Sequence, residues 1–387
     1  MQLSKRQKLW LVGGGIVVGL LLGEILARLV TPVRLRELVR GFKGERQKVC
    51  TIADERLDHR LRPNCEGLVK TEDFEFKVSS NALGLREREV DVEKSRGRYR
   101  VLMLGDSFAM GWGVEQEDRF SEVAAKLLKQ GEEGEKDRVE MINAGINSYS
   151  SVLELEYLRY KGIEFNPDLV MVWLDFSDLY DDYFYGGWQR QEQLRQALMP
   201  GSEEPVKEQI RRQERWFDWL IDKSKLFNYG FTRLVGAGLN FKQGLGWENL
   251  STNILIYERA MDWEEYDKAW NLPLANLRLM KEYLEGEEIE MVVVIAPRGI
   301  FFEGEWQAGR KLAGFKPEAY DWGAVKMIES KLRQLGVKVI DWHKVFLVAN
   351  KDESLFYDND GHWTIKGNQV AGKELARFLQ GAARGEL

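Results

Sequence analysis

Five short apolar runs in the last three quarters of the chain constrain its fold more than any other feature of the sequence. The runs are rich in Val, Leu, Ile and Met, and helical segments separate them. Such runs are typical of strands buried on both faces of a parallel sheet that helices cover on both sides. They occupy residues 100–106, 139–145, 169–175, 289–297 and 337–342. The pattern therefore predicts an α/β fold with a central parallel sheet of about five strands.

Helical periodicity and capping signals mark several segments between and after these runs. Residues 121–129 and 368–379 each place apolar side chains on one helical face. Ser151 and Glu154 have the spacing of a capping box and precede the helical stretch 153–160. We therefore predict a helix that begins at Ser151.

A long insertion, residues 183–284, separates the third predicted strand from the fourth. Its pattern is mostly helical, with Trp216, Trp219 and Leu226 at helix-like spacing. An insertion of this size at the carboxyl edge of a sheet is often a lid or a wall of the substrate site. A packed helical subdomain remains an equal alternative.

The segment before the first predicted strand, residues 31–98, is charged and carries only short apolar patches. Alternation in residues 73–80 predicts a strand, and Gly84 marks a turn after it. We interpret the segment as a stalk followed by a strand-bearing lead-in. Cys50 and Cys65 both lie in it, and they form either a small disulfide loop or two unrelated thiols.

The amino terminus, residues 1–30, has the pattern of a membrane anchor. Lys5, Arg6 and Lys8 precede an apolar stretch that extends to Val30 and is long enough to cross a bilayer. A cleaved signal peptide is the rival interpretation, but the small-residue cleavage site is poor. The basic residues before the stretch favour a cytoplasmic amino terminus. We therefore expect the main domain, residues 99–385, to lie outside the cytoplasm.

The charge balance excludes a broad nucleic-acid surface. The chain has 56 basic and 62 acidic residues, a net charge of -6, whereas nucleic-acid binding normally needs a basic face. No P-loop or zinc-ligand spacing is present, so the sequence implies neither a cofactor nor a metal. The 13 Trp and 13 Tyr are typical either of buried aromatics or of a sugar-binding platform.

Polar segments follow the predicted strands at the edge where parallel sheets bind ligands. Residues 105–107, 143–148 and 175–178 each come directly after a strand, and 358–363 lie beyond the last one. Because the carboxyl ends of parallel strands share one edge of the sheet, we expect these segments to meet.

These segments contain the groups that acyl transfer needs. Ser107 follows a strand and is the candidate nucleophile, with His362 as its general base. Asp360 can hold the imidazole in the required tautomer. The backbone amides of Ser107 and Gly145 can point at one oxyanion. The sequence therefore predicts a serine nucleophile with a catalytic triad.

The choice of histidine is narrow because the chain has only three. His59 lies in the charged stalk and is expected to be solvated, and His343 follows a strand and can be structural. His362 alone combines flanking aspartates, Asp358 and Asp360, with a turn-like setting before a helix. We therefore assign the base to His362.

The segments 105–108, 143–150 and 360–363 resemble the sequence blocks of the SGNH (GDSL) hydrolases, in that order along the chain. The resemblance covers about residues 80–385. It implies a flavodoxin-like three-layer sandwich, Ser107 as nucleophile and Gly145 as the oxyanion glycine. The Asp-x-His-Trp form of the last block is closest to the alginate O-acetyltransferase-like branch. In the usual spacing the acid lies three residues before the histidine, where this chain has Asn359, so Asp360 is the expected acid and Asp358 the reserve.

One position departs from the family pattern. The third block normally supplies an asparagine amide to the oxyanion hole, and this chain has Ser177 there. Loss of one oxyanion donor costs about 2.7–4 kcal/mol of transition-state stabilisation. Either Ser177 or a neighbour such as Asn147 replaces the amide, or the enzyme is slow, or the site is not catalytic.

The resemblance implies a membrane-anchored extracytoplasmic esterase or O-acyltransferase. Its partner would be an acyl ester, expected on an envelope glycan, and no protein partner is indicated. A non-catalytic envelope module that binds glycan or protein is the main alternative. A lysophospholipase or thioesterase is a third.

Overall fold

The computed structural model describes residues 49–130, 138–199, 267–302, 304–305, 323–349 and 353–384, all in one compact unit. The predicted anchor, residues 1–30, lies outside the described residues, as do the insertion's residues 200–266. In the described part of the chain, no helix is long and apolar enough to span a membrane.

A five-stranded parallel sheet forms the centre of the molecule. Its order is β6 (Val139–Asn143), β5 (Tyr99–Gly105), β7 (Leu169–Leu174), β8 (Glu290–Ile295) and β9 (Lys338–Asp341). Val101 of β5 lies between Met141 and Leu169 in register, and the side chains of β7 are all buried. The five predicted strands are thus confirmed, and the second-first-third-fourth-fifth order is that of a flavodoxin-like sheet.

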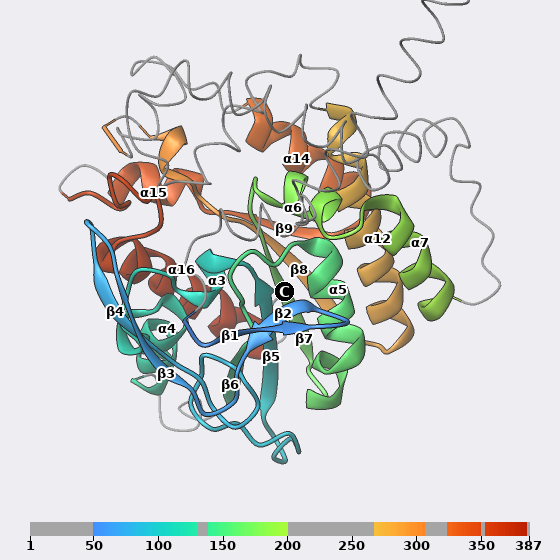
Figure 1. Ribbon diagram of the computed structural model, residues 1–387, viewed down its shortest axis with the longest axis horizontal. Coiled ribbons are helices and arrows are strands. Elements are labelled where there is room, and N and C mark those ends of the chain that lie inside the picture. The colour runs from blue at the N-terminus through green and yellow to red at the C-terminus, as the bar shows by residue number, and fades with distance from the viewer. Residues whose placement is uncertain are drawn as a thin grey trace, which may run out of the picture. The chain divides into compact units, whose positions relative to one another are not determined.

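Helices cover both faces of this sheet (Figure 1). α4 (Phe120–Lys129) packs against α16 (Ile365–Arg384) on one side, and Asn368 of α16 accepts from the Phe120 amide at 3.0 Å. α5 (Ser151–Tyr160), α7 (Gly187–Leu198) and α12 (Asn271–Gly286) pack together on the other side. The arrangement confirms a three-layer α/β sandwich.

Further helices connect these elements. They are α3 (Ser107–Met110), α6 (Asp178–Phe184), α14 (Gly323–Gln334) and α15 (His343–Ala349), with 3-10 segments η2 (Gln116–Asp118), η3 (Gly162–Phe165) and η4 (Gly299–Phe301). The described parts of the insertion, which include α7 and most of α12, are helical as predicted.

The predicted capping box of α5 is wrong, although the helix itself forms. Ser150 occupies the cap position, and no side chain of its own segment caps the helix. Instead Asp182 of α6 accepts from the Val152 amide at 2.8 Å and from the Ser151 hydroxyl. The carboxylate of Asp182, from a different helix, thus caps α5 in place of a side chain of its own segment. Glu154 is fully buried inside the sandwich.

The lead-in folds into two antiparallel hairpins. They are β1 (Thr51–Asp54) with β2 (Asp58–Leu61), and β3 (Glu66–Lys70) with β4 (Glu75–Ser79), where a strand was predicted. A disulfide joins Cys50, directly before β1, to Cys65, directly before β3. The disulfide therefore ties the two hairpins together.

Candidate active site

Ser107 lies where β5 turns sharply into α3 at the carboxyl edge of the sheet. A Cβ on Gly105 would lie 2.6 Å from Cβ of Ala109 and 2.8 Å from Cβ of Trp173, so only glycine fits the approach to this turn. Asp106 closes the turn by accepting from the Phe108 amide at 2.8 Å. As the first residue of α3, Ser107 has an amide with no acceptor inside the helix.

The structure brings Ser107, His362 and Asp360 together. His362 Nε2 lies 2.7 Å from Ser107 Oγ, although 255 residues separate the two. His362 Nδ1 contacts the Asp360 carboxylate on the opposite side of the ring. With the ring proton on Nδ1, Nε2 accepts a hydrogen bond from the Ser107 hydroxyl, which is the arrangement that base catalysis needs. Phe108 packs on the imidazole with ring centroids 4.8 Å apart.

The electrostatics of the site favour a basic imidazole. Burial opposes a positive charge on His362, but contact with Asp360 and the charges of Asp106 and Asp175 outweigh it, so the pKa of His362 is raised above 6.5. Burial, together with the charge of Asp175, raises the pKa of Asp106 to about 7. Ser107 Oγ lies 3.4 Å from Asp106 Oδ2. The nucleophile therefore lies between a basic imidazole and a weakly acidic carboxyl.

Of the two candidate acids, Asp360 is the one that reaches the histidine. Asp358 is exposed at the outer side of the same turn. Tyr357 and Gly361 close that turn with a backbone hydrogen bond of 2.9 Å, and the Tyr357 amide donates to the His362 carbonyl at 2.8 Å. This turn places the Asp360 carboxylate against His362 Nδ1. The role of Asp358 as a reserve acid stays a prediction.

Gly145 lies close to the nucleophile turn, but its amide is already in use. The amide donates to Asn143 Oδ1 at 2.9 Å. A Cβ at Gly145 would lie 2.5 Å from the Met110 nitrogen, so the glycine allows this loop to approach α3. An oxyanion role for Gly145 stays a prediction. It requires the Gly145 amide to break its hydrogen bond to Asn143 Oδ1 and to donate to the oxyanion instead.

Ser177 follows β7, the strand beside β5, and precedes α6 directly. Its side chain is buried and its amide donates to Asp175 Oδ2 at 3.0 Å. No described contact joins the Ser177 hydroxyl to Ser107. Its role as an oxyanion donor therefore remains a prediction.

The sequence did not predict several contacts at the site. Asp175 lies 3.4 Å from Nε of Arg298, which follows β8, and both side chains are buried. His59 was expected to be solvated, but its Nε2 lies 2.7 Å from the Asn147 carbonyl in the loop after β6. Only the position of Arg298 after a predicted strand could have indicated its place at this edge. His343 is buried against Asp341 at 2.6 Å, which fits a structural histidine.

Glu154 of α5 and Asp178 of α6 are fully buried carboxyl groups. None of the four carboxylate oxygens of Glu154 and Asp178 has a hydrogen-bond partner. Burial, and then neighbouring carboxylates, raise the pKa of both groups well above their usual values. Within the ranges that the structure describes, no group of three or more acidic, histidine or cysteine side chains is arranged to hold a metal ion.

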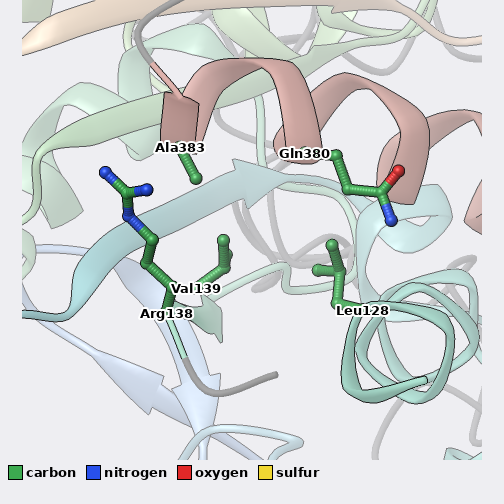
Figure 2. Close-up of a pocket in the computed structure, with 5 residues that line it drawn as sticks. All are labelled: Leu128, Arg138, Val139, Gln380 and Ala383. Atoms are coloured by element: carbon green, nitrogen blue, oxygen red, sulfur yellow. The ribbon is translucent and has the colours of Figure 1, made fainter. Parts of the chain in front are cut away.

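A small pocket lies far from this chemistry. Figure 2 shows its lining residues, Leu128, Arg138, Val139, Gln380 and Ala383, where the ends of α4 and α16 meet the start of β6. Its volume is about 10 Å³, close to the minimum for one water molecule. Because Val139 begins β6, the pocket lies at the amino edge of the sheet, opposite Ser107, and is no substrate site.

Comparison with known proteins gives one family match and distant structural likenesses. Residues 262–386 match the family described as the SGNH hydrolase-like domain of the acetyltransferase AlgX. No curated protein matches the chain. An esterase, EstA, from Pseudoalteromonas is 11% identical with a TM-score of 0.37, over 74% of this chain and 99% of that one. An acetylxylan esterase from Geobacillus stearothermophilus is 12% identical with a TM-score of 0.37, over 72% and 93%.

The similarity to this family rests on the matched segment and the sequence blocks, not on these distant likenesses. The matched residues include Asp360, His362 and Trp363, and Ser107 reaches them from the first strand of the sheet. The chain therefore contains, over residues 262–386, a segment that is similar to the SGNH hydrolase-like domain of AlgX.

Proposed function

We propose that the protein is a serine esterase or O-acyltransferase that works through an acyl-enzyme on Ser107. The observation that carries the proposal is the 2.7 Å contact between Ser107 Oγ and His362 Nε2, with Asp360 on the other ring nitrogen. A hydroxyl, a base and an orienting carboxylate in this order form the constellation that activates a serine.

The reaction follows from the geometry. His362 takes the hydroxyl proton as Ser107 Oγ attacks the acyl carbonyl, and the resulting oxyanion lies near the Ser107 amide at the start of α3. His362 then gives the proton to the leaving alkoxide, which leaves the acyl group on Ser107. In the second half, His362 takes a proton from water or a sugar hydroxyl as that oxygen attacks the acyl carbonyl. The bond between Ser107 Oγ and the acyl group then breaks, and His362 returns the proton to Ser107 Oγ.

The proposed substrate is an acyl ester on a glycan of the cell envelope. The resemblance to an acetyltransferase domain supports a short acyl group. The apolar stretch in residues 1–30 supports a membrane anchor that holds the domain outside the cytoplasm. The disulfide between Cys50 and Cys65 is consistent with an oxidising compartment.

The test is ester hydrolysis by the full-length protein over a series of acyl chain lengths. We expect turnover to be fastest with acetyl esters, to fall with chain length and to disappear in Ser107→Ala. Addition of an acetyl-accepting oligosaccharide should divert acetyl groups from water if the protein is a transferase. Preference for long chains would instead support the lipid-hydrolase reading, and equal turnover by Ser107→Ala would contradict the proposal.

A non-catalytic glycan-binding module is the second candidate, and two observations favour it. Serine replaces the family's asparagine at Ser177, and the Gly145 amide is bound to Asn143. Binding that survives Ser107→Ala, in a protein without ester turnover, would select this candidate. If the protein is an enzyme and Ser177 supplies the oxyanion donor in place of asparagine, Ser177→Ala should lower kcat by about 100-fold, because one oxyanion donor contributes that much.

A further inference from the structure

The lead-in contacts three segments that lie next to candidate active-site residues. His59 of β2 contacts the Asn147 carbonyl in the loop after β6 at 2.7 Å. Arg86 donates to the carbonyls of Met110 at 3.1 Å and Gly111 at 2.6 Å, at the end of α3. Asp73, at the turn between β3 and β4, binds the loop that carries Asp360 and His362. A segment that only linked the domain to an anchor would not need these contacts.

The Asp73 contact is the most direct of the three. Its Oδ2 accepts from the backbone amides of Asn359 at 3.0 Å and Asp360 at 2.9 Å. Its Oδ1 accepts from the side-chain amide of Asn359 at 2.7 Å. Three N–H donors thus converge on one carboxylate, and one of them belongs to the residue that holds the His362 ring. Hydrogen bonds to a charged acceptor are about twice as strong as those between neutral groups.

The hairpin that carries Asp73 is itself held in place. Phe74 packs on Tyr357 with ring centroids 4.8 Å apart, and the Tyr357 hydroxyl donates to the Gly113 carbonyl at 2.9 Å. Phe74 and Phe76 also pack against Trp112 in a small apolar core beside the main one. The disulfide at Cys65 fixes the start of the same hairpin. Packing, a hydrogen bond and the disulfide therefore fix the position of the hairpin that carries Asp73.

We propose that Asp73 is a positioning residue for the catalytic triad, an inference that rests on the proposed function. Its carboxylate fixes the backbone of residues 359–360, so that the Asp360 carboxylate meets His362 Nδ1 and the ring meets Ser107. Because a displacement of 1 Å at a catalytic group can cost about 100-fold in rate, an anchor at this turn sets the turnover number. The lead-in thus belongs to the catalytic domain.

The experiment compares Asp73→Ala and Asp73→Asn with the control Glu72→Ala, whose exposed side chain lies next to Asp73. Asp73→Ala should lower kcat about tenfold or more, with KM within about twofold of the control. Asp73→Asn keeps an oxygen that can accept both backbone amides, so it should retain most of the activity. The melting temperature of all three should stay well above the assay temperature.

A second measurement separates positioning from simple loss of structure. The pH titration of the His362 ring, followed by NMR in a chain with only three histidines, should move towards lower pKa in Asp73→Ala because Asp360 is no longer held against Nδ1. Glu72→Ala should titrate as wild type. Equal kcat and equal titration in Asp73→Ala and Glu72→Ala would overturn the proposal. So would a loss of kcat in Asp73→Ala that disappears on cooling, since that would show partial unfolding.

The same data distinguish this inference from the proposed function. If wild-type protein neither turns over esters nor reacts at Ser107, the proposed function fails. The His362 titration still decides whether Asp73 holds the turn, because it needs no substrate.

Discussion

At the residue scale, the charge of Asp360 acts directly on the imidazole that it contacts. Burial alone would make His362 harder to protonate, and the neighbouring carboxylates reverse that effect. The imidazole must be neutral to accept the Ser107 proton, so kcat/KM should rise with pH through an apparent pKa above 6.5.

Asp360→Asn tests this assignment. The variant removes the negative charge and allows the wrong tautomer, so kcat should fall about 10⁴-fold. The residual activity should rise with pH through a lower apparent pKa than that of wild type. Asp358→Asn is the matched control and should leave both quantities unchanged. The assignment of the acid would be wrong if the two variants exchanged these results.

The residues of the triad could be found from the sequence because each has a local signal. Ser107 follows a predicted strand, and His362 is one of only three histidines. Asp73 has no such signal: its contact with Asn359 joins positions 286 residues apart, and only the folded hairpin brings them together. His59 was misjudged for the same reason, since its partner Asn147 lies 88 residues away.

At the element scale, α16 and α4 approach so closely that their interface needs a glycine. A Cβ on Gly372 would lie 2.6 Å from Cβ of Val123 and 2.7 Å from the backbone carbonyl oxygen of Phe120. The carbonyl belongs to the first turn of α4 and cannot move without disturbing that helix. This contact joins α16, which begins shortly after His362, to α4, which follows α3 and η2 in the chain.

Gly372→Ala should therefore destabilise the protein by about 1–3 kcal/mol, the usual cost of overpacking. Gly286→Ala is the matched control, because its added methyl group meets no atom within 4 Å at the end of α12. That variant should be neutral or up to about 1 kcal/mol more stable, since alanine is the better helix former. Denaturant unfolding measures both. Similar stability changes in the two variants would contradict the close packing of α4 and α16.

The strands were easier to predict than the helix ends. Apolar runs such as 169–175 are buried on both faces, so almost all of their residues must be apolar, and this composition can be recognised in the sequence. The cap of α5 was mispredicted because Asp182, far along the chain, supplies the acceptor that Ser151 and Glu154 were expected to supply. Local propensity is thus overridden wherever a tertiary group offers a stronger contact.

At the scale of the whole molecule, buried carboxyl groups set the response of stability to pH. The pKa of Glu154 is raised by burial and then by Asp106 and Asp182. A group whose pKa is raised by folding contributes its full stability below its unfolded pKa, and that contribution is lost as pH rises towards its folded pKa. The pKa of Asp178 is raised in the same direction. Stability should therefore decline from mildly acidic to alkaline pH.

Glu154→Gln should flatten this decline, because the amide cannot ionise. We expect the melting temperature to fall more in wild type than in Glu154→Gln between about pH 5, where ordinary carboxyl groups are already ionised, and about pH 8. The melting temperature of Glu154→Gln should therefore rise relative to that of wild type as pH increases. Glu72→Gln, at an exposed position, should follow wild type. Parallel curves for wild type and Glu154→Gln would show that this carboxyl carries no such penalty.

The central claim is that Ser107, His362 and Asp360 form a working acyl-transfer site. Its most direct test is reaction of the full-length protein with a fluorophosphonate, followed by mass spectrometry to locate the adduct. We predict one adduct, on Ser107, which forms quickly in wild type, slowly in His362→Ala and not in Ser107→Ala. A folded wild-type protein without an adduct at Ser107, or an equal rate in His362→Ala, would contradict the account.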